Sequence, residues 1–193
     1  MRWYALRHPW LALKRWLCDE PRGLAQHVHL ILSATAGIMI WSLALMCFTI
    51  LAGKIFTSRL GIGDYFSFFW AWYKAAFIEE FVFRWLPLAP LLIIFRKRAM
   101  LWLMVASVYS SIFFGTAHYS YYEADWPGLS GVVLSLLNQG VGGFVWCLVF
   151  IRCARKADYF FVRPILTTTT GHFLFNMMVI AISREVPSTI FAP

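Results

Sequence analysis

The feature that most constrains the fold is an uninterrupted apolar run from Leu30 to Gly53. It contains no Asp, Glu, Lys or Arg and is about two dozen residues long, enough for one helix to cross the hydrocarbon core of a bilayer. Similar runs recur along the chain, and a water-soluble domain of 193 residues cannot bury that much apolar surface. The sequence therefore predicts an integral membrane protein.

Composition supports this class of protein. Of all residues, 61% are apolar and 13% are charged, and the charged fraction is roughly half of that in soluble domains. These values exclude a soluble enzyme and a disordered tail. The four cysteines, Cys18, Cys47, Cys147 and Cys153, show no metal-type spacing and are interpreted as packing residues.

The apolar segments predict an all-α fold, a polytopic integral membrane bundle of about five transmembrane helices. Pro87 and Pro90 are expected to kink the second of them. Residues 29–193 form one transmembrane domain, and residues 1–28 form a basic, aromatic N-terminal segment at the membrane interface. The predicted helices are Leu30–Gly53, Tyr65–Phe95, Met100–His118, Leu129–Ile151 and Val162–Ser183.

The basic residues behind the net charge of +8 lie in short clusters between the apolar runs. They form no continuous stripe, so we expect the lipid bilayer as a partner and no nucleic acid. The N-terminal segment, Arg96–Arg98 and the cluster around Arg152 fall on one side, and the Glu123 loop falls on the other. The positive-inside rule then predicts a cytoplasmic N-terminus. We expect the membrane to be a bacterial inner membrane.

Ionisable residues inside spanning helices are costly, so each is a functional candidate. Glu80 and Arg84 are four residues apart in the acid-before-base order and are expected to form an ion pair. Glu79 points about 100° away from Glu80 on the same helix. It is left as the carboxylate without a local partner, which suits a general base in an apolar site.

Two further helices carry polar side chains of the same kind. His172 and Asn176 share one face of the last helix and can donate hydrogen bonds to a developing oxyanion. His118, at the end of the third helix, can activate water together with Glu79. The reaction class that these residues favour is hydrolysis of a peptide bond by activated water, without a covalent intermediate.

These segments resemble the Glu-Glu-x-x-x-Arg, Phe-x-x-x-His and His-x-x-x-Asn motifs of the CPBP (Abi) family. Those intramembrane glutamic proteases include the type II CAAX prenyl endopeptidases and bacteriocin-processing or immunity proteins. The matching residues are Glu79-Glu80-Phe81-Val82-Phe83-Arg84, Phe114-Gly115-Thr116-Ala117-His118 and His172-Phe173-Leu174-Phe175-Asn176. The motif core, residues 77–176, covers about half of the chain.

The resemblance implies a protease acting on a membrane-anchored protein or peptide, with no metal or other cofactor. It implies that Glu79 and His118 activate water and that His172 and Asn176 stabilise the tetrahedral intermediate. Glu80 and Arg84 would support the site. Members commonly place Gly after the motif Arg, whereas Trp85 stands here, so helix packing or substrate entry at this point is expected to differ.

Several alternatives remain open at this level. Glu79, His118 and His172 are a ligand set for zinc, which would keep the site and change the chemistry. Gly128-Leu129-Ser130-Gly131 has the form of a rhomboid serine protease site, and Gly61-Ile62-Gly63-Asp64 that of a presenilin-type site. The polar groups could also serve transport, immunity or helix packing without catalysis.

Overall fold

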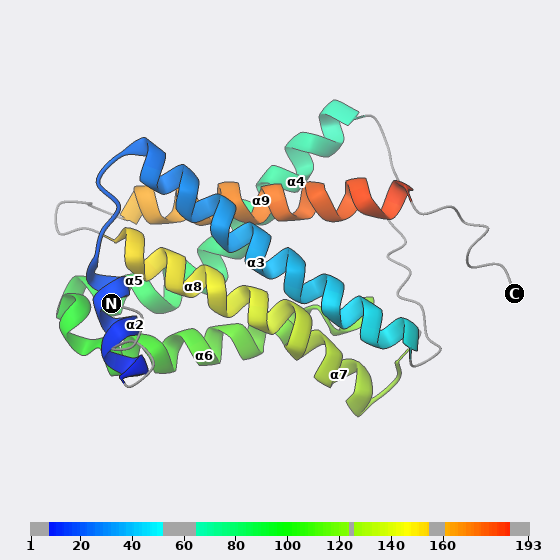
Figure 1. The fold of residues 1–193 in the computed structure, drawn as a ribbon, viewed down its shortest axis with the longest axis horizontal. Helices are drawn as coiled ribbons and strands as arrows, with labels where there is room; N and C mark the ends of the chain where they lie inside the picture. Colours follow the sequence, from blue (N-terminus) through cyan, green and yellow to red (C-terminus); the bar gives the residue numbers. More distant parts are fainter. Residues whose placement is uncertain (1–7, 52–64, 124–125, 155–160, 186–193) are drawn as a thin grey trace, which may run out of the picture.

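The computed structural model describes residues 8–51, 65–123, 126–154 and 161–185 (Figure 1). Every secondary-structure element in these ranges is helical, which confirms the all-α bundle. In chain order the elements are α2 (Pro9–Cys18), α3 (Leu24–Leu51), α4 (Tyr65–Glu80), η1 (Phe81–Trp85), α5 (Leu86–Phe95), η2 (Arg96–Ala99), α6 (Met100–Ala117), η3 (Tyr119–Tyr121), α7 (Leu129–Ser135), η4 (Leu136–Gly140), α8 (Val141–Cys153) and α9 (Val162–Glu185).

In its described residues, each of the five predicted apolar segments forms a helical run. Helix α8 packs against α3, α6 and α9, and α4 packs against α9, so the runs form a single bundle (Figure 1). Two stretches of the described chain, Leu24–Phe48 and Leu129–Cys153, are long and apolar enough to cross a membrane by length and composition. Helix α3 begins at Leu24, upstream of the predicted start at Leu30.

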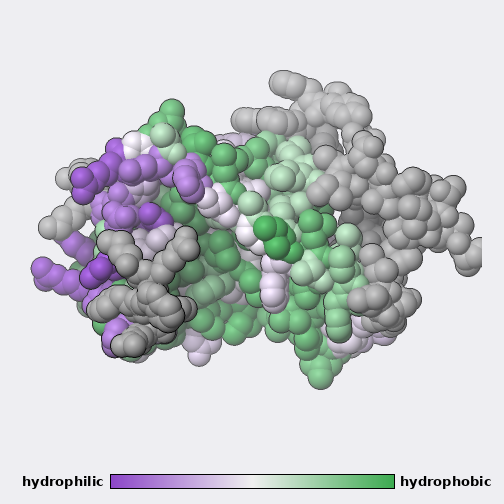
Figure 2. Space-filling view, viewed as in Figure 1, coloured by the Kyte–Doolittle hydropathy of each residue, from purple (hydrophilic) through white to green (hydrophobic). Residues whose placement is uncertain are grey.

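The apolar side chains divide between an interior and an outer surface. Leu88, Leu103 and Phe150 are fully buried between α5, α6 and α8. Ile40 and Trp102 are 69% and 62% exposed, and apolar residues cover the middle of the molecule in Figure 2. A broad apolar outer surface is what a bundle surrounded by lipid chains requires.

Basic residues gather at one end of the bundle, where Figure 2 shows the hydrophilic surface. Lys97, in η2, donates to the carbonyl oxygens of Leu17 and Arg152 at 2.9 and 3.3 Å. The guanidinium of Arg152 lies 4.2 Å from the ring centroid of Trp16 in α2. Helix α2 is therefore held across this end of the bundle, and its position in the headgroup region stays a prediction.

Replacing Lys97 with methionine is expected to loosen the docking of α2. The ammonium group satisfies carbonyls in the last turns of α2 and α8, and losing it should lower the free energy of unfolding by about 1–3 kcal/mol. Burial lowers the pKa of Lys97, with Glu20 opposing the shift. Because the unfolded chain then binds more protons, wild-type stability should rise with pH through the window between the lowered and the ordinary lysine pKa.

Thermal unfolding of the purified protein, measured from neutral to alkaline pH, tests this prediction. Arg98→Met is the matched control, because Arg98 is an exposed cation next to Lys97. An unfolding temperature of Lys97→Met equal to that of Arg98→Met, with the same pH dependence, would contradict it.

A π-helical turn, η1, directly follows Glu79 and Glu80. Pro87 lacks the N–H that would bond the carbonyl of Phe83 in an α-helix, and its ring crowds that carbonyl. The wider turn accommodates the ring, and the hydroxyl of Ser110 in α6 donates to the Phe83 carbonyl instead. The predicted distortion of this helix is thus a π turn stabilised by a neighbouring helix.

A second π turn, η4, joins α7 to α8. Here Trp41 of α3 donates its indole N–H to the carbonyl of Leu137 at 2.6 Å, and Ser42 donates to the side chain of Asn138 at 2.8 Å. Both distorted turns therefore receive hydrogen bonds from a neighbouring helix. π turns of this kind are frequent at functional sites.

Candidate active site

Three helical runs that are distant in sequence bring the predicted polar residues together. Glu79 and Glu80 end α4, Arg84 lies in η1, and His118 directly follows α6. His172 and Asn176 lie on α9, which packs against α4. Five of the six side chains are linked by contacts, and Asn176 is the exception.

Glu79 lies at the centre of these contacts. Its Oε2 atom is 3.5 Å from Nε2 of His172 and 3.9 Å from Nε2 of His118. Its side chain keeps 29% of its surface exposed, whereas Glu80 and Arg84 are 0% exposed. Of the two adjacent carboxylates, Glu79 is therefore the one that a water molecule or a substrate can reach.

The orientation of His118 is fixed by its own helix. Its Nδ1 atom lies 2.7 Å from the carbonyl oxygen of Phe114, one turn earlier. Because a carbonyl only accepts, Nδ1 carries the proton in this contact, and in the neutral ring Nε2 is left with a lone pair. That lone pair faces the Glu79 side of the site. The geometry is that of two bases, an imidazole and a carboxylate, that can share one water molecule.

Glu80 links two of the other groups. Its Oε1 atom accepts a hydrogen bond from Nδ1 of His172 at 2.9 Å, and its Oε2 atom is 3.4 Å from Nε of Arg84. The ion pair predicted between Glu80 and Arg84 is confirmed. The contact with His172 goes beyond that prediction: Glu80 holds the imidazole with Nε2 facing Glu79.

Phe114, the first residue of the second motif, packs between the polar groups. The guanidinium of Arg84 lies 4.2 Å from its ring centroid, a cation–π distance. The rings of His118 and His172 lie 4.4 and 5.8 Å from the same ring. Phe-x-x-x-His spacing places these two side chains one turn apart on a helix, so the motif itself indicates the contact between Phe114 and His118.

Tyr121 covers the outer side of His118. Its ring packs edge-on against the imidazole, 5.3 Å away, and is itself 61% exposed. Partial burial raises the pKa of Tyr121, and the negative charge of Glu79 raises it further. Tyr121 is thus a functional candidate that the motifs did not include, because its place depends on how the chain turns after α6.

Asn176 is half-buried one turn beyond His172 on α9. Across the described ranges, no hydrogen bond or ion pair joins it to the other five side chains. Its predicted role beside His172 stays a prediction.

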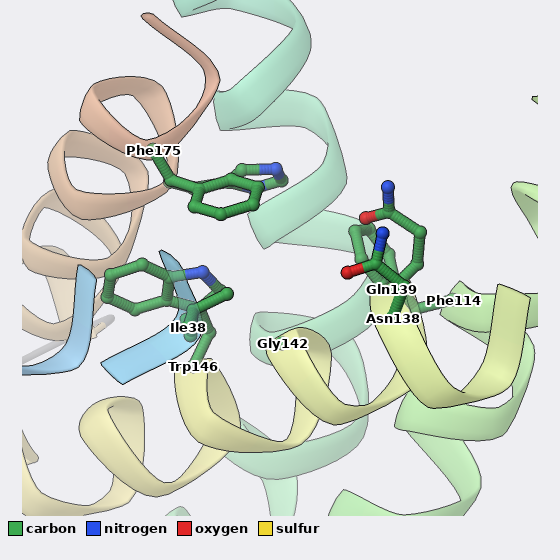
Figure 3. A pocket seen from close by; sticks show the side chains of 8 residues that line it. Ile38, Phe114, Asn138, Gln139, Gly142, Trp146 and Phe175 are labelled. Carbon is green, nitrogen blue, oxygen red and sulfur yellow. The ribbon is translucent and has the colours of Figure 1, made fainter. Parts of the chain in front are cut away.

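A small cavity of about 10 Å³ adjoins His172 (Figure 3). It is lined by Phe114, by the carboxamides of Asn138 and Gln139 in η4, and by apolar side chains from α3, α8 and α9. This volume accommodates about one water molecule. Asn138 also accepts a hydrogen bond from Ser42 and donates one to Tyr122, as expected of a residue that joins helices.

The structure bears on the alternative sites. Ser130 is exposed at the start of α7 and donates its hydroxyl to the carbonyl of Pro127 at 3.0 Å. Asp64 and its motif lie outside the described residues. Within the described part of the chain, no three His, Cys, Asp or Glu side chains are arranged to hold a metal ion.

The two glycines around Ser130 have structural reasons to be glycine. Gly128 has φ 68° before α7, a conformation that L residues rarely adopt. A Cβ atom at Gly131 would collide with the carbonyl oxygen of Trp126 and with the ring of Tyr119. Turn geometry and close packing therefore account for the Gly-x-Ser-Gly pattern.

Replacing Gly131 with alanine is accordingly expected to lower the free energy of unfolding by about 1–3 kcal/mol through overpacking. Ser130→Ala, one residue earlier and exposed, should leave stability unchanged. Thermal unfolding of the two variants beside the wild type checks this. A variant at Ser130 that lost more stability than the one at Gly131 would contradict the packing explanation.

Residues 61–178, more than half of the chain, match the family model of type II CAAX prenyl endopeptidase Rce1-like proteins. The chain belongs to this Rce1-like family. The matched range includes all six residues of the three motifs. No curated protein and no solved structure matches the chain. Family membership confirms the resemblance seen in the motifs and makes the chain a membrane-integral member of a family of CAAX-type endopeptidases.

Proposed function

We propose that this protein is an intramembrane endopeptidase that hydrolyses a peptide bond by water activated at Glu79 and His118. The observation that carries the proposal is the convergence of an accessible carboxylate with two imidazole Nε2 atoms, 3.5 and 3.9 Å away, from two other helices. This arrangement suits general-base catalysis in a site shielded from bulk water. The family match supports the same reaction class.

The mechanism follows from the orientation of each group. A water molecule between Glu79 and His118 loses a proton to this pair, and its oxygen attacks the scissile carbonyl carbon. His172, oriented by Glu80 and carrying a proton on both ring nitrogens, and Asn176 donate hydrogen bonds to the resulting oxyanion. The proton then passes to the leaving nitrogen as the C–N bond breaks, so water is consumed and no covalent enzyme intermediate forms.

Glu80 and Arg84 act in this mechanism through His172. The carboxylate of Glu80 accepts a hydrogen bond from Nδ1–H of His172, so Nε2 of His172 is directed at the reaction centre. Arg84 compensates the charge of Glu80 in a fully buried position. Neither needs to touch the substrate.

The position of the site indicates which substrates can reach it. Helix α6 has 18 residues, about 27 Å of rise, between the basic end at η2 and His118. If the basic end is cytoplasmic, the site lies in the outer half of a bacterial inner membrane. That orientation suits the membrane-anchored tail of an exported protein better than a prenylated cytosolic protein. A reporter fusion that placed the Glu123 loop in the cytoplasm would contradict this orientation.

Cleavage of a co-expressed panel of membrane-tethered peptides tests the proposed reaction. We expect the wild type and Ser130→Ala to cleave at equal rates, His118→Ala to be inactive, and a metal chelator to have no effect. Loss of activity in Ser130→Ala would indicate serine chemistry, and loss on chelation would indicate zinc bound by Glu79, His118 and His172. A wild type that cleaves no member of a panel including prenylated and exported tails would favour a non-catalytic role.

A further inference from the structure

The cavity beside His172 has two chemically different walls. Asn138 and Gln139 present carboxamides on one side, and Ile38, Trp146 and Phe175 present apolar surface (Figure 3). A volume of about 10 Å³ admits one oxygen-sized group at a time. Because His172 and Gln139 both line this volume, a single oxygen atom placed in it lies beside both side chains.

The two carboxamides differ in how they are held. Asn138 has its oxygen and its nitrogen engaged, by Ser42 and by the hydroxyl of Tyr122, each at 2.8 Å. It therefore anchors the π turn to two neighbouring segments. Gln139 is the next residue and lies near the hydroxyl of Tyr122. A glutamine amide has two N–H donors, so at least one donor is available to a group in the cavity even when the other is directed at Tyr122.

A carboxamide in a membrane-spanning helix is costly unless it is used. The π turn explains why both carboxamides of η4 line one cavity, since the wider turn changes the direction of successive side chains. Asn176, which the family motif places in the oxyanion role, does not line this cavity. The cavity thus offers a donor that the three motifs do not include.

We propose that Gln139 donates an amide N–H to the scissile carbonyl oxygen of the substrate, together with His172, as that oxygen gains negative charge. Asn138 is the positioning residue that holds the π turn. The inference rests on the proposed hydrolysis and adds to it a substrate-contacting residue. Preorganised donors of this kind act on the transition state more than on the bound substrate.

The test compares wild type, Gln139→Leu and Gln139→Glu on a cleaved membrane-tethered peptide and on the same peptide with a thioamide at the scissile bond. We expect Gln139→Leu to lower kcat about 10²–10³-fold with KM nearly unchanged, as for loss of one oxyanion donor. Sulfur is a poor acceptor, so the thioamide should slow the wild type strongly and the variant much less. A structural role for Gln139 would leave the oxygen-to-sulfur rate ratio unchanged.

Each outcome decides between the two proposals. Gln139→Glu keeps the shape of the side chain but removes the amide donors. If Gln139→Leu does not fold, the same comparison is made with Gln139→Glu. An active wild type with unchanged kcat in both variants, or with an unchanged oxygen-to-sulfur ratio, overturns the role of Gln139 and leaves the proposed hydrolysis intact. A wild type that cleaves neither peptide, nor any other of the panel, overturns both.

Discussion

Replacing Glu79 with glutamine is expected to lower kcat for peptide cleavage by about two to four orders of magnitude while the protein stays folded. General-base catalysis contributes about 10²–10⁴-fold, and an amide cannot accept the proton of water. Glu79 is partly exposed, and within the described residues its ionic contacts are with His118 and His172. Its replacement therefore leaves no charge buried without a counterion, so the thermal unfolding temperature should change little.

The measurement is the initial cleavage rate of a membrane-tethered peptide by equal amounts of folded protein. Glu123→Gln is the matched control, because it makes the same chemical change at an exposed carboxylate after η3. Cleavage by Glu79→Gln within threefold of the wild type would remove Glu79 from the mechanism. The inactive variant should also retain uncleaved substrate, which makes it suitable for capturing the natural target.

The fold was largely predictable because lipid imposes simple rules on a chain. A spanning segment must satisfy its backbone internally, so apolar length alone indicates a helix. The five apolar segments are indeed helical. Pro87 predicted a distortion of the second helix, but the π form of the two turns was not predictable in this way. Each π turn depends on a hydrogen-bond donor from another helix, such as Ser110 for the carbonyl of Phe83. No periodicity in the local sequence indicates such a donor.

The sequence predicted the helices that carry the candidate residues, five of which make contact in the structure, but it did not predict most of the connections between them. Helical spacing alone predicted the ion pair of Glu80 and Arg84. The contact between Glu80 and His172 joins residues 92 positions apart, and only the packing of α4 against α9 creates it. For the same reason the sequence could not assign the Phe114 ring to three partners or bring Gln139 and His172 to one cavity. Local periodicity specifies a face of one helix, whereas a site requires the angles between helices.

The second large effect concerns the charge buried beneath the site. Arg84 and Glu80 are both fully buried and form an ion pair. Across the described residues, the guanidinium nitrogens make no hydrogen bond. The positive charge of Arg84 is compensated by the carboxylate of Glu80 and by the ring face of Phe114, whose centroid is 4.2 Å away. Removing the cation would leave the Glu80 carboxylate buried without its counterion, although the hydrogen bond from His172 would remain.

Replacing Arg84 with methionine is therefore expected to lower the free energy of unfolding by about 3–5 kcal/mol, the usual effect of leaving one partner of a buried ion pair alone. Arg84→Lys should lower the free energy of unfolding by less, because it keeps the positive charge. It still loses the planar stacking on Phe114. Arg98→Met makes the same change at an exposed position and should be neutral. Unfolding of the purified proteins in one detergent gives the comparison.

The pair also predicts a non-additive result. Once Glu80 is replaced by glutamine, no buried carboxylate remains for Arg84 to compensate, so the double variant Glu80→Gln with Arg84→Met should be more stable than the sum of the single effects implies. If Arg84→Met loses less than about 1 kcal/mol, or if the two changes simply add, then the ion pair does not determine the stability of this site. In that case, the hydrogen bond from His172 to Glu80 would have to hold the carboxylate by itself, and His172→Ala should then destabilise the protein more than Arg84→Met.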